Sequence, residues 1–414
     1  MKIKKIKALE VFDSRGVPAL ECILYLDNEL SFKAKVPSGI SKSRYELPEL
    51  RDGGQRYSGQ GLQRSIELIE DVIAPKFVGR VPDAIQMDLD LINLDSNPKR
   101  SSLGANTTLA ISMCIYRAQA YLENLELFEF ISYIIGKETV TIPIPILNFI
   151  DGGLHACNNL SIQEYLVIPA GAQSFAQSME KSWDYFNLLK VYLEKNTKNL
   201  CMSNSGGFSA NFNSTIAPLE FLHDAKKNLG LREDFFMFGL DVSASHIYDQ
   251  NTRLYQFEDD LKTTQQLIDW YKMLVDKYEV YYLQDPLNQD DVASWVKLTS
   301  LLSEKCLISG DDIFATDLER VVKGVESFCA NSVVIKMNQI GTVTEAIQVV
   351  KVSHEAGLAT VVSSRFGDSE DDFISDLAVG VSSNFIKSGG LVGSHNLAKY
   401  NRLIEIESYL LSIS

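Results

Sequence analysis

The feature that most constrains the fold is a series of eight short apolar runs that begins near residue 140. Amphipathic segments separate the runs, and this alternation is typical of a (β/α) barrel. The runs read IPIPILN, EYLVIPA, FMFGLD, VYYLQ, CLISG, SVVIK, ATVVSS and FIKSG. We therefore expect an α/β protein in which residues 136–414 form a C-terminal (β/α)8-type barrel.

The first 135 residues have a different pattern. Three strand-like runs, KIKALEVFD, ALECILYLD and LSFKAKVP, are separated by residues that favour turns. Two segments of helical periodicity follow, GLQRSIELIEDVIAPKF and NTTLAISMCIYRAQAYLENL. The pattern predicts a small N-terminal α+β domain over residues 1–135. Because no Gly- or Ser-rich linker precedes the barrel, we expect the two domains to pack closely.

Charge and composition exclude several classes of protein. The formal net charge is −15, which argues against nucleic-acid binding because a phosphate backbone needs a positive surface. No stretch approaches about 18 consecutive apolar residues, so we expect no membrane span. The six cysteines form no C-x-x-C pair, and neither a zinc site nor a disulfide framework is indicated. We expect a cytoplasmic location, where thiols stay reduced.

Polar residues end the later apolar runs. These residues are Asp241, Gln284, Asp311, Lys336, Ser364 and Lys387. In a barrel such positions converge on the C-terminal mouth, where active sites lie. For any single residue, the exit of a strand into a polar loop is a sufficient explanation. Six polar strand ends in series, with acids and lysines among them, indicate an active site.

The residue types at these strand ends suggest a chemistry. Asp241 and Asp311 suit a hard cation such as Mg²⁺, which prefers oxygen ligands. Lys336 and Lys387 can act as a general base or as charge clamps. A divalent metal facing a lysine suits proton abstraction next to a carboxylate. A structural salt bridge between Lys336 and Asp311 is the alternative, and composition does not choose between them.

Several stretches together carry a family resemblance. They read FDSRGVPALE, VPSGIS, ELRDG, LGANTTLAIS, GGLHACNN, IQEYLVIPAGAQSF, LDVSAS, GDDIFATD, IKMNQIGTVTEA, IKSG and LAKYNRLIEIE. In order and spacing they resemble the enolase (phosphopyruvate hydratase) family over nearly the whole chain. The resemblance implies a small α+β domain followed by an αβ-barrel. It also implies the glycolytic reaction of that family, the reversible Mg²⁺-dependent dehydration of 2-phosphoglycerate to phosphoenolpyruvate.

The resemblance implies roles for individual residues. Lys336 matches the general base, which removes the C2 proton, and Lys387 matches a second lysine near the substrate carboxylate. Asp241 and Asp311 match two ligands of the first Mg²⁺. Ser38, in the mobile loop, matches a ligand of the second Mg²⁺. Further active-site positions are matched by His155, Gln163, Glu164 and Arg365, of which Arg365 would face the phosphate.

The chain departs from the family pattern within the same site. Gln284 stands where the family has the third metal-ligating carboxylate, a glutamate. Ser205 stands at the position of the general acid, also a glutamate, because SNSGGFSAN replaces G-D-E-G-G-F-A-P-N. In SSRFGDSED, Ser364 replaces a histidine and Phe366 replaces a phosphate-binding serine. General acid assistance is worth roughly 10²–10⁴ in rate, and a serine hydroxyl does not supply it at neutral pH.

The substitutions leave three hypotheses open. The first is a degenerate enolase paralogue with a weakened Mg²⁺ site and impaired or lost hydratase activity, acting through binding or assembly. The second is an enzyme that enolises a different carboxylate. The third is an active enolase with compensation, in which Asp285 replaces the lost ligand or Glu164 relays a proton through water. If active, the protein would bind a small phosphorylated carboxylate.

The resemblance also suggests an assembly. The family commonly forms homodimers, so we expect a homodimer, and association with an intact enolase is a further option.

Overall fold

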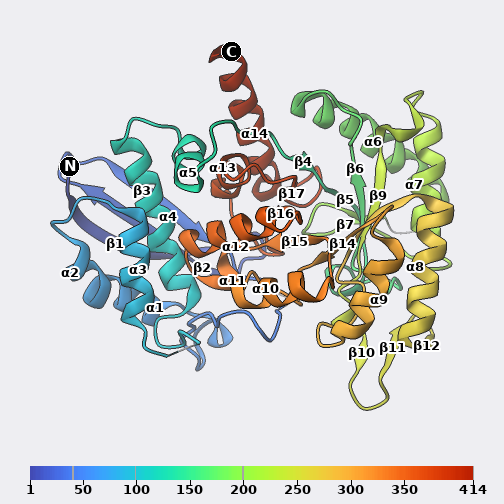
Figure 1. Ribbon diagram of the computed structural model, residues 1–414, viewed down its shortest axis with the longest axis horizontal. Helices are drawn as coiled ribbons and strands as arrows, with labels where there is room; N and C mark the ends of the chain where they lie inside the picture. Colours follow the sequence, from blue (N-terminus) through green and yellow to red (C-terminus); the bar gives the residue numbers. More distant parts are fainter. Residues whose placement is uncertain (40–41, 98, 198–199, 414) are drawn as a thin grey trace.

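The computed structural model describes residues 1–39, 42–97, 99–197 and 200–413 (Figure 1). The chain forms a small α+β part followed by a barrel with helices around it, and the predicted α/β class is confirmed. The first part contains β1 (Ile3–Phe12), β2 (Pro18–Leu26), β3 (Ser31–Val36), η1 (Arg56–Gly59), α1 (Gln63–Glu67), η2 (Leu68–Ile73), α2 (Ala74–Phe77), α3 (Ala84–Leu94), α4 (Ala105–Leu122) and α5 (Leu127–Ile135).

The three N-terminal strands form an antiparallel meander in the order β1-β2-β3. The middle strand β2 is buried along almost its whole length, because α4 covers one face of the sheet. In α4, most side chains are buried, which places this helix between the sheet and the barrel (Figure 1). The predicted meander followed by helices is therefore present.

The barrel is built on an 11-stranded sheet in the order β4-β17-β16-β15-β14-β13-β9-β6-β5-β8-β7. Its strands are β4 (Ile144–Pro145), β5 (Leu147–Asp151), β6 (Glu164–Ile168), β7 (Cys201–Met202), β8 (Phe208–Ser209), β9 (Met237–Asp241), β13 (Val280–Gln284), β14 (Leu307–Gly310), β15 (Ser332–Ile335), β16 (Ala359–Ser363) and β17 (Phe385–Lys387). Because β4 pairs with β17 and the adjoining β5 pairs with β6, the two ends of the sheet meet in residues 144–151 and the barrel closes.

One strand runs against the expected direction. β6 is antiparallel to both of its neighbours, β5 and β9, whereas the strands from β9 to β17 are parallel. The N-terminal end of β6 therefore lies at the same rim as the C-terminal ends of the parallel strands. The barrel therefore contains one reversed strand, and the apolar run EYLVI carries no signal of its direction.

Helices and short elements surround the barrel. They are η3 (Gly153–His155), α6 (Phe175–Asn196), α7 (Ala217–Lys227), η4 (Glu233–Phe235), η5 (Ala244–His246), α8 (Thr264–Tyr278), α9 (Val292–Leu302), α10 (Leu318–Ser327), α11 (Met337–Ile340), α12 (Val343–Glu355), α13 (Phe373–Gly380) and α14 (Ser394–Ile413). A small separate sheet contains β10 (Tyr248–Asp249), β11 (Leu254–Phe257) and β12 (Asp260–Lys262). Among the described residues, no helix combines the length and apolar character needed to cross a bilayer.

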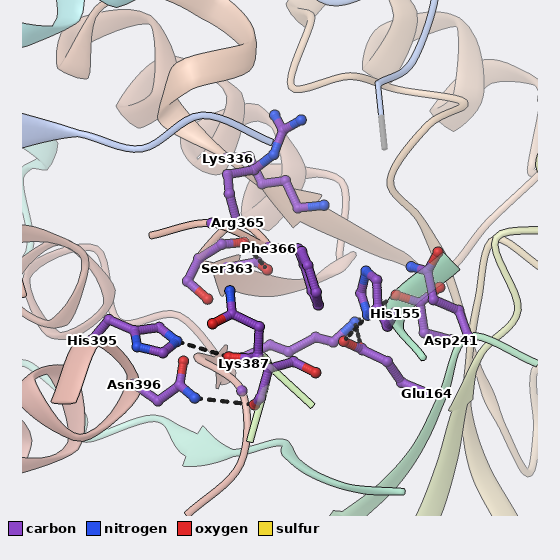
Figure 2. A pocket seen from close by; sticks show the side chains of 16 residues that line it. His155, Glu164, Asp241, Lys336, Ser363, Arg365, Phe366, Lys387, His395 and Asn396 are labelled. Atoms are coloured by element: carbon purple, nitrogen blue, oxygen red, sulfur yellow. Dashed lines mark hydrogen bonds and ion pairs between the residues drawn. The ribbon is translucent and has the colours of Figure 1, made fainter. Parts of the chain in front are cut away.

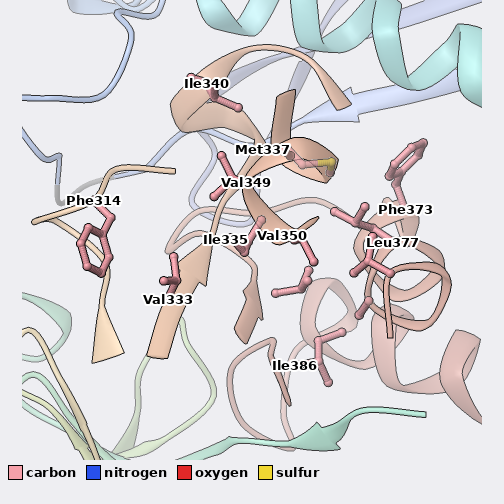
Figure 3. Packing of buried hydrophobic residues seen from close by; sticks show 14 of the residues in the cluster. Phe314, Val333, Ile335, Met337, Ile340, Val349, Val350, Phe373, Leu377 and Ile386 are labelled. Carbon is pink, nitrogen blue, oxygen red and sulfur yellow. The ribbon is translucent and has the colours of Figure 1, made fainter. Parts of the chain in front are cut away.

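Alternation along the strands divides the core into two layers. One cluster fills the barrel interior and consists of Ile146, Leu166, Ile168, Tyr282, Val334, Val361 and Phe385. The alternate residues point outward to the helices, as Val333, Ile335 and Ile386 do where they pack with Val349 and Val350 of α12 (Figure 3). Successive strand side chains point to opposite faces, so the inward row continues at every second residue.

This inward row becomes polar at the barrel mouth. Gln284 follows Tyr282 by two residues, Lys387 follows Phe385, and Lys336 follows Val334. On the antiparallel β6 the same row reaches Glu164, two residues before Leu166. The apolar interior thus supports a layer of charged side chains above it, which is the position expected for a barrel active site.

Buried polar groups join the two domains. The Asp88 carboxylate of α3 accepts hydrogen bonds from the Thr344 backbone amide at 3.0 Å, the Thr344 hydroxyl at 2.6 Å and the Ser112 hydroxyl at 2.9 Å. Arg100 forms a bidentate ion pair with Glu345 nearby. These contacts agree with the expectation that the domains pack closely.

Replacement of Asp88 should change how stability depends on pH. Burial raises the pKa of Asp88 to about 6, although hydrogen bonds from Thr344 and Ser112 oppose the shift. Between about pH 4 and pH 6 the unfolded chain therefore loses this proton while the folded state keeps it, so the free energy of unfolding falls as pH rises. Relative to that of Asp88→Asn, the free energy of unfolding of the wild type should fall by up to about 3 kcal/mol, mostly between pH 4 and pH 6.

Urea unfolding at a series of pH values measures this difference. The exposed residue Glu138 provides a control, because Glu138→Gln should leave the pH profile parallel to that of the wild type. Parallel profiles for the wild type and Asp88→Asn would contradict the role given to Asp88.

Candidate active site at the mouth of the barrel

Most of the predicted site residues line a single pocket at the barrel mouth (Figure 2). The predicted residues among them are His155, Gln163, Glu164, Ser205, Asp241, Lys336, Ser364, Arg365, Phe366 and Lys387. Gln284 and Asp311 lie behind this lining and contact it through hydrogen bonds. The cavity has a volume of about 40 Å³, far below the roughly 300–1,000 Å³ of pockets that enclose drug-sized ligands.

Lys387 is the centre of a buried charge network. Its ammonium group lies 2.6 Å from Asp241 Oδ2 and 2.6 Å from Glu164 Oε2, and it donates to Gln284 Oε1 at 2.9 Å. Burial alone would lower the pKa of Lys387, but Asp241 and Glu164 raise it well above its usual value. Lys387 is therefore held as an ammonium ion that offsets part of the negative charge of these two carboxylates.

Gln284 connects this network to a second ion pair. Its side-chain oxygen accepts hydrogen bonds from Lys387 and from the Tyr282 hydroxyl at 2.9 Å, and its Nε2 donates to Asp311 Oδ2 at 2.9 Å. Two donors on one side and a carboxylate on the other determine the orientation of the amide. The carboxylate of Asp311 also contacts Lys336 Nζ, so the salt bridge that the sequence left open is present.

Asp241, Gln284 and Asp311 do not fit a Mg²⁺ ion in this arrangement. A Mg²⁺ ion requires oxygen ligands directed at one point, whereas Gln284 turns its N–H group toward Asp311 and its oxygen toward Lys387. Asp285 does not replace the missing carboxylate. Its side chain accepts hydrogen bonds from the backbone amides of Asp311 and Asp312 at 3.0 Å each.

Ser38 lies outside the pocket. Its hydroxyl accepts a hydrogen bond from Arg15 Nη2 at 2.8 Å and lies 3.3 Å from Asp13 Oδ2. The predicted mobile loop VPSGIS continues into residues 40–41, which lie outside the described residues. The structure therefore brings Ser38 to the N-terminal domain and not to the other predicted metal ligands.

The expected phosphate end of the pocket is occupied by protein groups. Arg365 Nη1 donates to Glu46 Oε2 at 2.7 Å and to Asn338 Oδ1 at 3.0 Å. Gly39 lies against the guanidinium group, since a Cβ atom there would come within 2.0 Å of Arg365 Nη2. Phe366 lies beside His155 (Figure 2), and the two rings stack with their centroids 4.2 Å apart.

The position of the general acid carries a hydroxyl bound to a neighbouring carboxylate. Ser205, in the loop between β7 and β8, donates to Asp151 Oδ2 at 2.8 Å. His155 Nδ1 lies 3.0 Å from Glu164 Oε1 and 3.7 Å from Asp151 Oδ1. Burial alone lowers the pKa of His155, but Asp151 and Glu164 raise it to about 9.

Asp151 was missed in the sequence, as were Asn148 and Glu46. The apolar run IPIPILN ends at Asn148, whereas the strand continues to Asp151. Polar residues at the ends of the barrel strands converge on the mouth. The same reasoning applied to this strand identifies Asp151, which precedes His155 by four residues. No sequence signal pairs Glu46 with Arg365, since these residues are 319 positions apart.

Removal of the Glu46 carboxylate should turn Arg365 into an anion-binding group. Arg365 and Glu46 are both buried, and removing one partner of such an ion pair costs about 3–5 kcal/mol. Glu46→Ala should therefore lower the melting temperature, and inorganic phosphate should restore part of the loss. Thermal unfolding with increasing phosphate measures both effects.

The double variant Glu46→Ala/Arg365→Met is the matched control. It lacks the guanidinium group, so phosphate should stabilise it no more than it stabilises the wild type. An equal phosphate response in Glu46→Ala and the double variant would show that Arg365 is not accessible to an anion.

Comparison with known families agrees with the architecture. Residues 3–131 match the family described as "Enolase, N-terminal domain", and residues 139–413 match "Enolase, C-terminal TIM barrel domain". The two matches cover nearly the whole chain, and they correspond to the small sheet domain and the barrel described above. The chain belongs to the enolase family.

Proposed function

We propose that this protein is an enolase-family member in which the Mg²⁺-dependent dehydration of 2-phosphoglycerate is impaired or lost. The family match supports an enolase-like enzyme. The observation that carries the proposal is the amide of Gln284, which links Lys387 to Asp311 where the family has a third carboxylate. Lys336 and Lys387 thus form ion pairs with carboxylates on either side of this amide.

Loss of the third carboxylate supports a weakened Mg²⁺ site. An amide oxygen can still bind a cation, but it contributes no negative charge. The hydrogen bond from the Lys387 ammonium group to Gln284 Oε1 would also have to break before this oxygen could bind a metal ion. Metal ions contribute several kcal/mol to the stabilisation of transition-state charge, so weaker binding lowers the rate directly.

The other substitutions act on different parts of the reaction. Ser205 offers a hydroxyl that is already hydrogen-bonded to Asp151, and a hydroxyl is not a general acid at neutral pH. Arg365 is paired with Glu46, and Phe366 covers His155 in a cavity of about 40 Å³. A three-carbon phosphorylated substrate would have to displace these contacts in order to bind.

Restoration of two carboxylates should restore part of the activity. We expect the double variant Ser205→Glu/Gln284→Glu to form phosphoenolpyruvate at least 100-fold faster than the wild type, because general acid assistance alone is worth roughly 10²–10⁴. A coupled assay across a range of Mg²⁺ concentrations measures the rate. The same titration reports whether Gln284→Glu lowers the Mg²⁺ concentration needed for half-maximal activity.

Lys336→Ala in the double variant is the control, since it removes the residue at the position of the base. Rapid Mg²⁺-dependent turnover by the wild type, with little gain in the double variant, would overturn the proposal. That outcome would support an active enolase whose substitutions are compensated.

We further propose that the protein is a cytoplasmic homodimer that can associate with an intact enolase. Six free cysteines, four of them buried, support a reducing location. Light scattering on the purified chain, alone and mixed with an active enolase, should show a mass of two chains. A mass of one chain at micromolar concentration in both samples would contradict this assembly.

A further inference from the structure

We propose that Asp151, His155 and Glu164 bind a divalent transition-metal ion, with Zn²⁺ the best match. This site is separate from the Asp241, Gln284 and Asp311 positions. The inference does not depend on whether hydratase activity is lost.

The three side chains converge from neighbouring elements. Asp151 ends β5, and the antiparallel register pairs it directly with Glu164 at the start of β6. His155 ends η3, four residues after Asp151. One ligand atom from each side chain lies within 4.8 Å of the other two, and all three side chains are buried. The antiparallel direction of β6 is what brings a carboxylate from each strand to the same point.

Unpartnered polar atoms point to a ligand at this position. Gln163 is 4% exposed and lines the cavity at the barrel mouth together with His155 and Glu164, and its side-chain oxygen has no hydrogen-bond partner among the described residues. The His155 side chain is 6% exposed, and neither ring nitrogen forms a hydrogen bond within the described part of the chain. The 3.0 Å approach of His155 Nδ1 to Glu164 is thus an ion-pair distance without hydrogen-bond alignment. Buried polar atoms are rarely left without partners, so these atoms indicate a ligand.

The Asp151 carboxylate is held in place by hydrogen bonds from four neighbouring residues. Asn148 Nδ2 donates to its Oδ1 at 2.6 Å, and both Ser203 and Ser205 donate to its Oδ2. The backbone amide of Gly207 adds a hydrogen bond at 3.2 Å. Metal-binding carboxylates are commonly oriented in this way by hydrogen bonds from a surrounding layer. The serine that replaces a general acid at position 205 therefore acquires a positioning role.

The local charge balance favours a dication. Asp151, Glu164 and Asp241 contribute three carboxylates around one ammonium group, Lys387. Two further carboxylates have their own cations, because Asp311 pairs with Lys336 and Glu46 with Arg365. The carboxylates that surround Lys387 therefore carry two more negative charges than that ammonium group neutralises, and one divalent ion would neutralise both. A proton on His155 neutralises only one.

The ligand types select the metal class. An imidazole nitrogen suits Zn²⁺ and related transition ions, whereas Mg²⁺ strongly prefers oxygen ligands. Zn²⁺ takes four ligands in most protein sites, and the Gln163 oxygen or a water molecule can provide the fourth. The cavity of about 40 Å³ has room for an ion and a water molecule but not for a bulky ligand.

Calorimetric titration of the metal-stripped full-length protein with ZnCl₂ or MgCl₂ tests the proposal. We expect one Zn²⁺ ion per chain, a rise in melting temperature with Zn²⁺, and Mg²⁺ affinity at least 100-fold weaker. In His155→Gln the Zn²⁺ dissociation constant should rise by at least about 100-fold. The matched control is His246→Gln at the same barrel mouth, which should leave Zn²⁺ affinity unchanged.

Zinc X-ray absorption on the wild type gives a second readout that does not depend on the folding of a variant. We expect nitrogen and oxygen ligands at about 2.0–2.1 Å and no sulfur at about 2.3 Å. The exposed thiols Cys157 and Cys201 are the competing ligands, and sulfur in the spectrum would overturn the proposal. Lack of saturable Zn²⁺ binding, or unchanged binding in a folded His155→Gln, would also overturn it. None of these outcomes alters the test of hydratase activity.

Discussion

The hydrogen bonds of one neutral amide, Gln284, connect the charges at the barrel mouth. Buried ions are costly unless each has a partner, and here Lys387 and Asp311 share Gln284 as a common neighbour. The amide has an acceptor for the ammonium side and a donor for the carboxylate side. A glutamate at this position would add a negative charge and would have no N–H group for Asp311. The substitution therefore produces a network in which the protein's own groups satisfy one another.

The side chains at other positions of the mouth also contact protein groups. The Ser205 hydroxyl is bound to Asp151, and Phe366 stacks on His155. Arg365 is paired with Glu46. The pocket is consequently small and its charges are mostly compensated. The exception is the corner around Asp151, His155 and Glu164, where negative charge exceeds positive charge and polar atoms lack partners.

Much of the architecture was predictable because it follows from local patterns. Strand alternation, helical periodicity and turn residues indicated the three-stranded meander, the helices after it and the barrel. The polar strand ends Asp241, Gln284, Lys336 and Lys387 lie at one rim of the barrel, because parallel strands bring their C-terminal ends together. The antiparallel direction of β6 was not predictable, because an apolar run has the same periodicity in either direction.

The sequence by itself determined which residues stand at the mouth and which family positions are substituted, since both depend on strand period and residue identity. Only the tertiary structure decided what those residues contact. The pairing of Glu46 with Arg365 and the convergence of Asp151 with Glu164 depend on long-range packing and on the direction of one strand. The orientation of the Gln284 amide is likewise a tertiary property, because Lys387, Tyr282 and Asp311 come from three different strands or strand ends. Hydrogen bonds between residues far apart in the chain leave no periodic trace in the sequence.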